Sequence, residues 1–154
     1  MDACPTHAIL GPGRLHPQNC ILSNNVGREM PREEIRGNLG THIHGCDLCQ
    51  AVCPRNQKII QNASRKDPFI QVLKELFDLE KLLILEEDYY QDVVYPIMHN
   101  YIRDMDIFRR NAAIALGNTG DPKYIPALEK AALSKNQQMR EAALWAIDKI
   151  SRQE

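Results

Sequence analysis

The chain has 154 residues and a mass of 17.6 kDa, which suits one compact domain or two small ones. Its 19 Lys and Arg residues against 20 Asp and Glu leave a net charge of -1, so overall charge does not argue for binding to nucleic acid or membranes. The longest apolar stretches fall short of the roughly 20 residues that span a bilayer. The first residues lack the basic and apolar regions of a secretory signal, and we expect a cytoplasmic protein without membrane contact.

Composition divides the sequence near residue 60. Residues 1–60 hold all five cysteines and many turn-forming residues, Asn24-Asn25 among them, and only Pro31 to Leu39 offers a plausible helix. So little regular structure needs another source of stability, which a metal centre can supply. We therefore predict a ferredoxin-like cluster domain over residues 1–60 and an all-helical domain over 61–154, giving an α+β, mostly α fold.

The second half shows helical periodicity from Asp67 onward. Asp67 is a predicted N-cap, Pro68 occupies the first helical position, and apolar residues recur on one face to about Asp78. Further helices are predicted over residues 88–102 with a bend at Pro96, and over 106–118, 122–133 and 136–151.

A weak internal repeat lies within these helices. Phe108-Arg109 and Met139-Arg140 are 31 residues apart, and each is followed by similarly spaced Ala and by Leu or Ile. Small residues at helix crossings allow close stacking, and the pattern resembles HEAT-type repeats. One helix pair and one more helix are too few repeats to stand alone, so we expect them to pack on the preceding helices.

The cysteines form a ferredoxin-like pattern. Cys46, Cys49 and Cys53 make a Cys-x2-Cys-x3-Cys-Pro run, and Cys4 begins a second Cys-Pro pair. In two-cluster ferredoxins the Cys before Pro binds the other cluster. This rule assigns Cys4, Cys46 and Cys49 to one iron–sulfur cluster, with Cys20 as the fourth ligand, and assigns Cys53 to a second cluster.

The other ligands of the second cluster would precede Met1, so we expect the chain to be part of a longer protein. The alternative metal is structural zinc, bound by Cys pairs or by Cys together with His42 or His44. The two Cys-Pro pairs and the lack of a second Cys-x2-Cys favour iron–sulfur. Disulfides are the weakest interpretation in a reducing compartment.

These motifs resemble the epoxyqueuosine reductases, cobalamin-dependent iron–sulfur enzymes of tRNA queuosine synthesis. The similar segments are Cys4 to Ile9, Asn19 to Ile21, Pro31 with Glu33 to Arg36, and Gly45 to Asn56. The helical tail is similar to the HEAT-like extension of some members. His7, Leu22 to Asn25 and Arg55 depart from the family pattern, in which Gly usually stands at the position of His7.

The resemblance implies the electron-transfer part of an oxidoreductase that is not catalytically complete alone. One 4Fe-4S cluster on Cys4, Cys20, Cys46 and Cys49 would pass electrons to cobalamin on a preceding catalytic domain, and no catalytic residue is assigned here. The implied partners are that domain, tRNA, and an electron donor such as ferredoxin or flavodoxin. The alternatives are an electron-transfer subunit of another corrinoid-dependent reductase, and a non-redox scaffold stabilised by metal.

Several other side chains have both a functional and a structural interpretation. His42 and His44 either tune a cluster or pack in a loop, and packing is favoured. Two basic groups are candidates for contact with RNA phosphates: Arg55, Lys58, Arg65 and Lys66, and Arg109, Arg110 and Arg140. For the first group the alternative is a solvated linker, and for the second group it is inter-repeat salt bridges. The aromatic residues Tyr89, Tyr90, Tyr95 and Trp145 are predicted to pack in the core.

Overall fold

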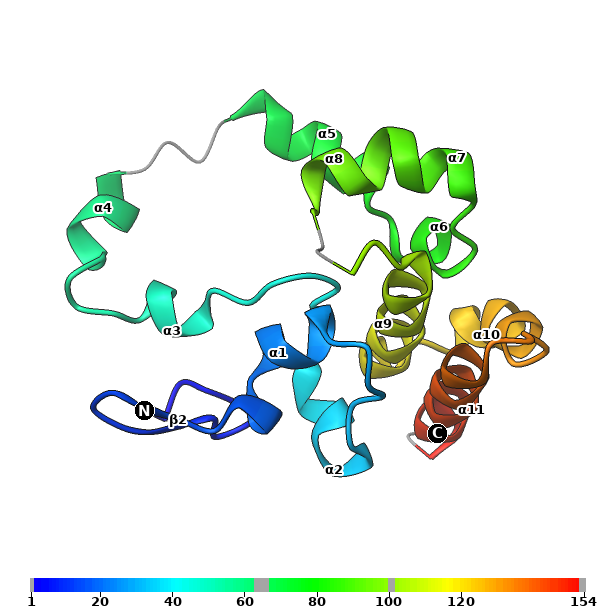
Figure 1. Cartoon of the computed structure of the whole chain (residues 1–154), viewed down its shortest axis with the longest axis horizontal. Coiled ribbons are helices and arrows are strands. Elements are labelled where there is room, and N and C mark those ends of the chain that lie inside the picture. The colour runs from blue at the N-terminus through cyan, green and yellow to red at the C-terminus, as the bar shows by residue number, and fades with distance from the viewer. Residues whose placement is uncertain (1, 63–66, 100–101, 153–154) are drawn as a thin grey trace.

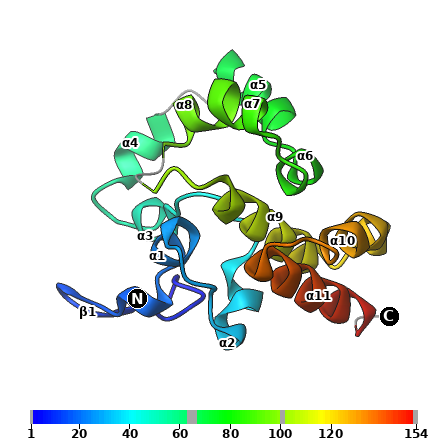
Figure 2. The same cartoon turned by 45° about the vertical axis from the view of Figure 1, so that its right-hand side comes forward.

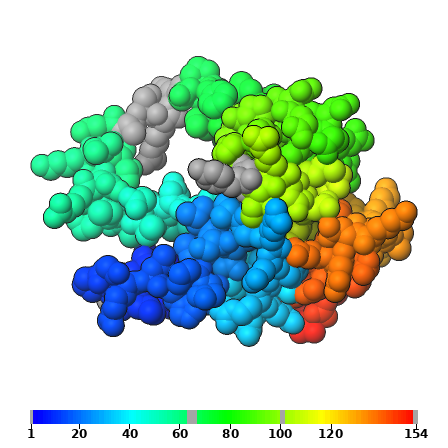
Figure 3. All heavy atoms as spheres, in the orientation of Figure 1, coloured from blue at the N-terminus to red at the C-terminus, as the bar shows by residue number. Residues whose placement is uncertain are grey.

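The computed structural model describes residues 2–62, 67–99 and 102–152. It is mostly helical, as predicted, and the described residues contain one small two-stranded sheet. Within these residues, the helices are all too short or too polar to cross a membrane. The N-terminal strands lie at one end of the molecule and helix α10 lies at the other (Figures 1 and 3).

The cysteine-rich half consists of short elements. Strand β1 (Ile9–Gly11) pairs antiparallel with β2 (Arg14–Leu15). A 3-10 turn, η1 (Pro17–Asn19), leads into α1 (Ile21–Val26). The remaining elements are α2 (Glu33–Arg36), the 3-10 turn η2 (Gly37–Leu39), α3 (Leu48–Ala51) and α4 (Gln57–Asn62).

The helix predicted over Pro31 to Leu39 is present as α2 followed by η2. The hairpin and α1, α3 and α4 were not predicted, because each is too short to show a periodic pattern. Asn24 and Asn25 were taken for turn residues, and this was wrong, since both lie inside α1.

The second half contains the predicted helices. They are α5 (Pro68–Leu76), α6 (Leu79–Leu83), α7 (Glu87–Tyr89), the π-helical turn η3 (Tyr90–Val94), α8 (Tyr95–Ile97), α9 (Met105–Thr119), the 3-10 turn η4 (Pro122–Tyr124), α10 (Ile125–Ala131) and α11 (Gln137–Ser151). Helix α6 was not predicted separately.

Side-chain caps explain where these helices begin. The carboxylate of Asp67 accepts a hydrogen bond from the Phe69 N–H at 2.9 Å, and the Asn136 side chain accepts one from Met139 N–H at 3.0 Å. The bend predicted at Pro96 takes the form of a π-helical turn. Because Pro96 has no N–H, it cannot continue the α-helical ladder, and the Tyr95 N–H instead donates to the Tyr90 carbonyl.

Helix α9 is the centre of the molecule. Figure 2 shows it between α1 and α2 on one side and α10 and α11 on the other. Most of its residues from Ile107 to Gly117 are buried, and it packs against both α6 and α11. The HEAT-like helices thus contact a preceding helix, as expected.

The core also extends into the cysteine-rich half. Ile21, Ile35, Leu39 and Ile43 are buried in the same cluster as the apolar residues of α9 and α11. The domain boundary near residue 60 stays a prediction, and side chains from both sides of it share one core. In contrast, α5 has no buried residue, and Phe69 is 50% exposed.

Gly117 allows the closest approach between α9 and α11. A Cβ on Gly117 would lie 2.7 Å from both Cα and Cβ of Ala146, which is closer than real atoms pack. We expect Gly117→Ala to lower the free energy of unfolding by about 1–3 kcal/mol, because overpacking outweighs the better helix propensity of Ala. Urea unfolding followed by circular dichroism measures this change.

The matched control is Gly37→Ala. There the new Cβ would meet only the flexible Nζ of Lys149, at 3.5 Å, and we expect a change within about 0.5 kcal/mol. Equal stability of both variants would contradict the close crossing of α9 and α11.

Candidate iron–sulfur centre

All five cysteines are free thiols in or near short elements. Cys4 precedes the hairpin, Cys20 is the N-cap of α1, and Cys46 lies in the loop before α3. Cys49 is an exposed residue within α3, and Cys53 follows it closely. No cysteine is fully buried, so each thiol is within reach of a bound group.

The Cys4 sulfur receives hydrogen bonds from its own turn. The Thr6 hydroxyl oxygen lies 3.4 Å from Cys4 Sγ, and the Ala8 N–H donates to that sulfur at 3.4 Å. Burial works to raise the pKa of the Cys4 thiol, but these hydrogen bonds outweigh burial and lower the pKa below its usual value. The turn therefore favours a thiolate, the form that binds metal.

The same turn explains one departure from the family pattern. His7 has a φ of 51°, in the left-handed region that favours glycine, and its N–H donates to the Cys4 carbonyl at 3.0 Å. The resemblance noted from the sequence led us to expect Gly at this position. His7 keeps the turn around Cys4 at some cost in backbone strain, and histidine is among the non-glycine residues that tolerate this region best.

Three of the predicted ligands influence one another electrostatically. Burial raises the pKa of Cys46, and the nearby charges of Cys20, Cys49 and Asp47 raise it further. Thiolates gathered in this way repel each other unless a cationic group binds them, which suits a metal cluster. Cys4 and Cys53 are not among the groups that act on Cys46, so the four-ligand set stays a prediction.

The cysteine-rich half shows no preformed site for a single metal ion among the described residues. In the described part of the chain, no three His, Cys, Asp or Glu side chains lie close enough to hold one ion. A structural zinc ion is bound by four such side chains that all converge on the one ion. A four-iron cluster makes a different demand, because each thiolate binds its own iron and the sulfur atoms stay farther apart.

His44 packs beside the cysteines. Its ring stacks on Phe108 with centroids 5.7 Å apart, and burial, together with the charge of His99, lowers its pKa. Its Nδ1 atom is buried without a hydrogen-bond partner among the described residues. The packing interpretation is confirmed for His44, and a role in cluster tuning stays a prediction.

The proposed RNA contact of the helical arginines is wrong for Arg110. Its side chain is fully buried, and burial lowers its pKa to about 10, so it remains charged at neutral pH. Arg109 is engaged with the Leu85 carbonyl and with Asp106 of its own helix. Arg110 makes no inter-repeat salt bridge in the described structure either, because its partners are backbone carbonyls and amide side chains.

The structure also describes some of the remaining basic residues and all four aromatic residues singled out in the sequence. Arg55 and Lys58 are exposed, whereas Arg65 and Lys66 lie outside the described residues. The packing role predicted for the aromatic residues is confirmed: Tyr90 is buried, Tyr89, Tyr95 and Trp145 are half-buried, and all four belong to the core or pack against it.

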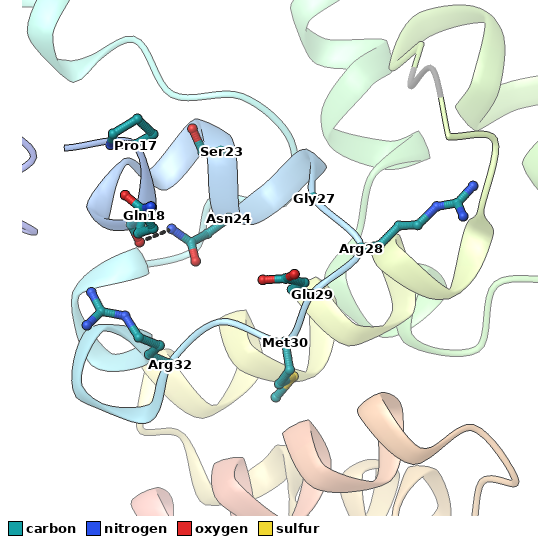
Figure 4. A pocket seen from close by; sticks show the side chains of 9 residues that line it. All are labelled: Pro17, Gln18, Ser23, Asn24, Gly27, Arg28, Glu29, Met30 and Arg32. Atoms are coloured by element: carbon teal, nitrogen blue, oxygen red, sulfur yellow. Dashed lines mark hydrogen bonds between the residues drawn. The ribbon is translucent and has the colours of Figure 1, made fainter. Parts of the chain in front are cut away.

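A pocket of about 470 Å³ opens beside α1. Figure 4 shows Glu29 and Arg32 around it and the carboxamide of Asn24 directed to Gln18. The Asn24 amide donates to the carbonyls of Gln18 at 3.0 Å and of Cys20 at 2.8 Å. The side chain of Asn24 thus holds the backbone at Cys20, a role that the sequence did not reveal.

The opposite pKa shifts of Cys4 and Cys46 predict different reactivities in the metal-free protein. At pH 8, iodoacetamide should modify Cys4 several-fold faster than Cys46, because a larger share of Cys4 is thiolate. The difference should vanish as the pH rises above both pKa values. Peptide mass spectrometry measures both rates.

Thr6→Val is the control for this prediction. The change removes the hydroxyl hydrogen bond while keeping the shape of the side chain, so it should slow alkylation of Cys4 and leave Cys46 unaffected. If Cys46 reacts faster than Cys4 in the wild type, the assigned hydrogen bonds do not control the thiol.

Comparison with known proteins matches both halves of the chain. Residues 1–56 match the family model of the 4Fe-4S double cluster binding domain, and residues 84–154 match that of HEAT repeats. These matches confirm the predicted order of a cluster domain followed by HEAT-like helices. The chain therefore contains a cluster-binding domain of the 4Fe-4S type.

Relatives match nearly the whole chain. The epoxyqueuosine reductase of Lactococcus garvieae (strain Lg2) is 35% identical over 152 residues, which are 97% of the chain and 42% of that protein. The epoxyqueuosine reductase of Bacillus subtilis (strain 168) is 32% identical over 153 residues, or 97% of the chain and 39% of that protein.

A crystal structure of epoxyqueuosine reductase with a tRNA-Tyr epoxyqueuosine-modified tRNA stem loop has the same fold. It matches with a TM-score of 0.80 at 30% identity, covering 97% of this chain and 40% of that one. The chain thus spans about two fifths of the length of the relatives it matches. On this evidence the chain belongs to the epoxyqueuosine reductase family, with which it shares a double-cluster domain and the HEAT-like helices that follow.

Proposed function

We propose that this chain is the electron-transfer part of an enzyme that reduces epoxyqueuosine to queuosine in tRNA. The observation that carries the proposal is the match of residues 1–56, which hold all five cysteines, to the 4Fe-4S double cluster binding domain. When bound, the cluster supplies one-electron transfer toward a cobalamin held by a catalytic domain. The relatives are more than twice as long as the matched region, which leaves room for such a domain.

The residues of this chain hold and tune the cluster in this proposal. Cys4, Cys20, Cys46 and Cys49 bind it as thiolates, and Cys53 serves a second cluster. The hydrogen bonds that Cys4 receives from Thr6 and Ala8 withdraw charge from its sulfur. Such bonds favour the reduced, more negative cluster and raise its reduction potential.

The partners follow from the same assignment. A relative was crystallised with a modified tRNA stem loop, and we propose that tRNA carries the substrate of the complete enzyme here as well. Exposed Arg55 and Lys58, shortly after the last cysteine, are two basic side chains available for a phosphate contact or for an acidic electron donor. The donor is a ferredoxin or flavodoxin, and the compartment is the cytoplasm.

Anaerobic reconstitution with iron and sulfide tests the proposal. We expect about four irons per chain and an EPR signal of a reduced cubane after treatment with dithionite. Bound zinc, or no stable metal, would overturn the assignment of an electron-transfer role to this chain.

The ligand partition makes a sharper prediction for two variants. Cys20→Ser should lose most of the iron, because Cys20 is far in sequence from both Cys-Pro runs and has no neighbouring cysteine in the chain to replace it. Cys53→Ser should keep the iron of this cluster largely intact, because Cys53 belongs to the other ligand set. Iron analysis and EPR amplitude measure both, and equal losses in the two variants would refute the partition.

A further inference from the structure

We propose that Arg110 and Asn111 of α9 are positioning residues for the cluster, because they fix the backbone segments that carry Cys20 and Cys46 relative to each other. The inference rests on the proposed function, in which both cysteines bind one cluster. Neither side chain touches a cysteine. Their effect is transmitted through backbone carbonyls that lie between α9 and the cysteine-bearing segments.

Arg110 binds the chain that leaves the Cys20 helix. Its guanidinium donates to the carbonyl of Asn24 at 3.0 Å and of Gly27 at 3.2 Å, at the end of α1. It also donates to the carbonyls of Arg28 at 3.3 Å and Glu29 at 2.8 Å. A planar guanidinium with several fixed donors is suited to holding such a set of carbonyls, and a flexible ammonium is not.

Asn111 joins this segment to the one that carries Cys46. Its amide donates to the carbonyl of Asn25 at 2.8 Å and to the carbonyl of Ile43 at 2.7 Å. Its oxygen accepts from Arg110 at 3.0 Å, so the two side chains orient one another. Both are almost completely buried, and hydrogen bonds in such a site hold their geometry firmly.

Two further hydrogen bonds connect the backbone held by Arg110 and Asn111 to the backbone at or beside the cysteines. The side chain of Asn24 donates to the Cys20 carbonyl at 2.8 Å. The side chain of Asn25, only 1% exposed, donates to the carbonyl of Gly45, which precedes Cys46, at 3.4 Å. Residues 24 and 25 therefore link α9 to the backbone beside both ligands.

The cysteine-rich half needs this external support because its own elements are short. Helix α1 has six residues and α3 has four, and their backbone hydrogen bonds alone give little rigidity. Helix α9 has 15 residues and lies in the core. Groups that orient metal ligands from outside commonly change metal affinity by about 10–100-fold when removed.

Asn118 provides a matched control on the same helix. Its amide also donates to two carbonyls of the cysteine-rich half, those of Arg36 and Gly40, at 2.9 and 2.8 Å. Its oxygen accepts from Lys149. These carbonyls belong to α2 and the turn after it, away from the cysteines in sequence, so Asn118 shares the chemistry of Asn111 without the link to Cys20.

The experiment compares Asn111→Leu with Asn118→Leu in two assays. In the reconstituted protein, we expect Asn111→Leu to lose iron to a chelator about tenfold faster than the wild type, with a shifted reduction potential and altered EPR spectrum. Asn118→Leu should lose iron less than about twofold faster and should keep both signatures. Urea unfolding of the metal-free variants accounts for any general loss of stability.

The second assay needs no cluster. Dibromobimane cross-links two nearby thiols, and we expect cross-linking of Cys20 to Cys46 in the metal-free protein to slow about tenfold in Asn111→Leu but not in Asn118→Leu. If the wild type forms no cluster but cross-linking differs in this way, the positioning role stands and the proposed function fails. If both variants behave alike in both assays, the positioning role is overturned.

A second variant covers the case in which Asn111→Leu does not fold. Arg110→Lys keeps the positive charge in the same place but cannot reach all of the carbonyls at once. It should slow the cross-linking of Cys20 to Cys46 in the same direction. Cross-linking at the wild-type rate in folded Arg110→Lys would contradict the role of Arg110.

Discussion

The fold depends on the buried guanidinium of Arg110, which donates hydrogen bonds to backbone carbonyls. Among the described residues, Arg110 forms no ion pair, and its guanidinium is instead surrounded by carbonyls of residues 24–29 and by amide side chains. A buried charge without such partners would be strongly destabilising. The contact stabilises both partners. The carbonyl dipoles of the loop after α1 stabilise the positive charge of Arg110, and Arg110 donates hydrogen bonds to carbonyls that short helices leave without partners.

This arrangement gives the cysteine-rich half two supports. One is the metal centre, whose binding supplies folding free energy to a segment with little regular structure. The other is α9, which holds the same segment through Arg110, Asn111 and Asn118 and through the shared apolar core around Ile21 and Leu39. The second support is made of hydrogen bonds and apolar contacts that involve no metal.

The sequence predicted the parts of this structure that depend on local patterns. The predicted cap at Asp67 and the period of apolar residues located the long helices, whereas the cluster ligands assigned from cysteine spacing stay a prediction. The sequence did not predict the role of Arg110, because its backbone partners lie more than 80 residues away and backbone carbonyls carry no sequence signal. Asn24 and Asn25 were misassigned for a related reason: Asn favours turns locally, and tertiary hydrogen bonds from Arg110 and Asn111 to their carbonyls favour α1 here.

The position of Arg110 also changes how the HEAT-like helices are understood. Repeat helices can form extended binding surfaces, and from the sequence alone the arginines of these helices were candidates either for RNA phosphates or, slightly favoured, for inter-repeat salt bridges. In this chain, the α9 side that bears Arg110 and Asn111 faces the cluster half, while Gly117 packs against Ala146 of α11. A helix closed in on both sides cannot form part of an RNA surface there. The repeat-like helices therefore act first as an internal support for the cluster domain, and any contact with tRNA must come from other, exposed residues of the chain.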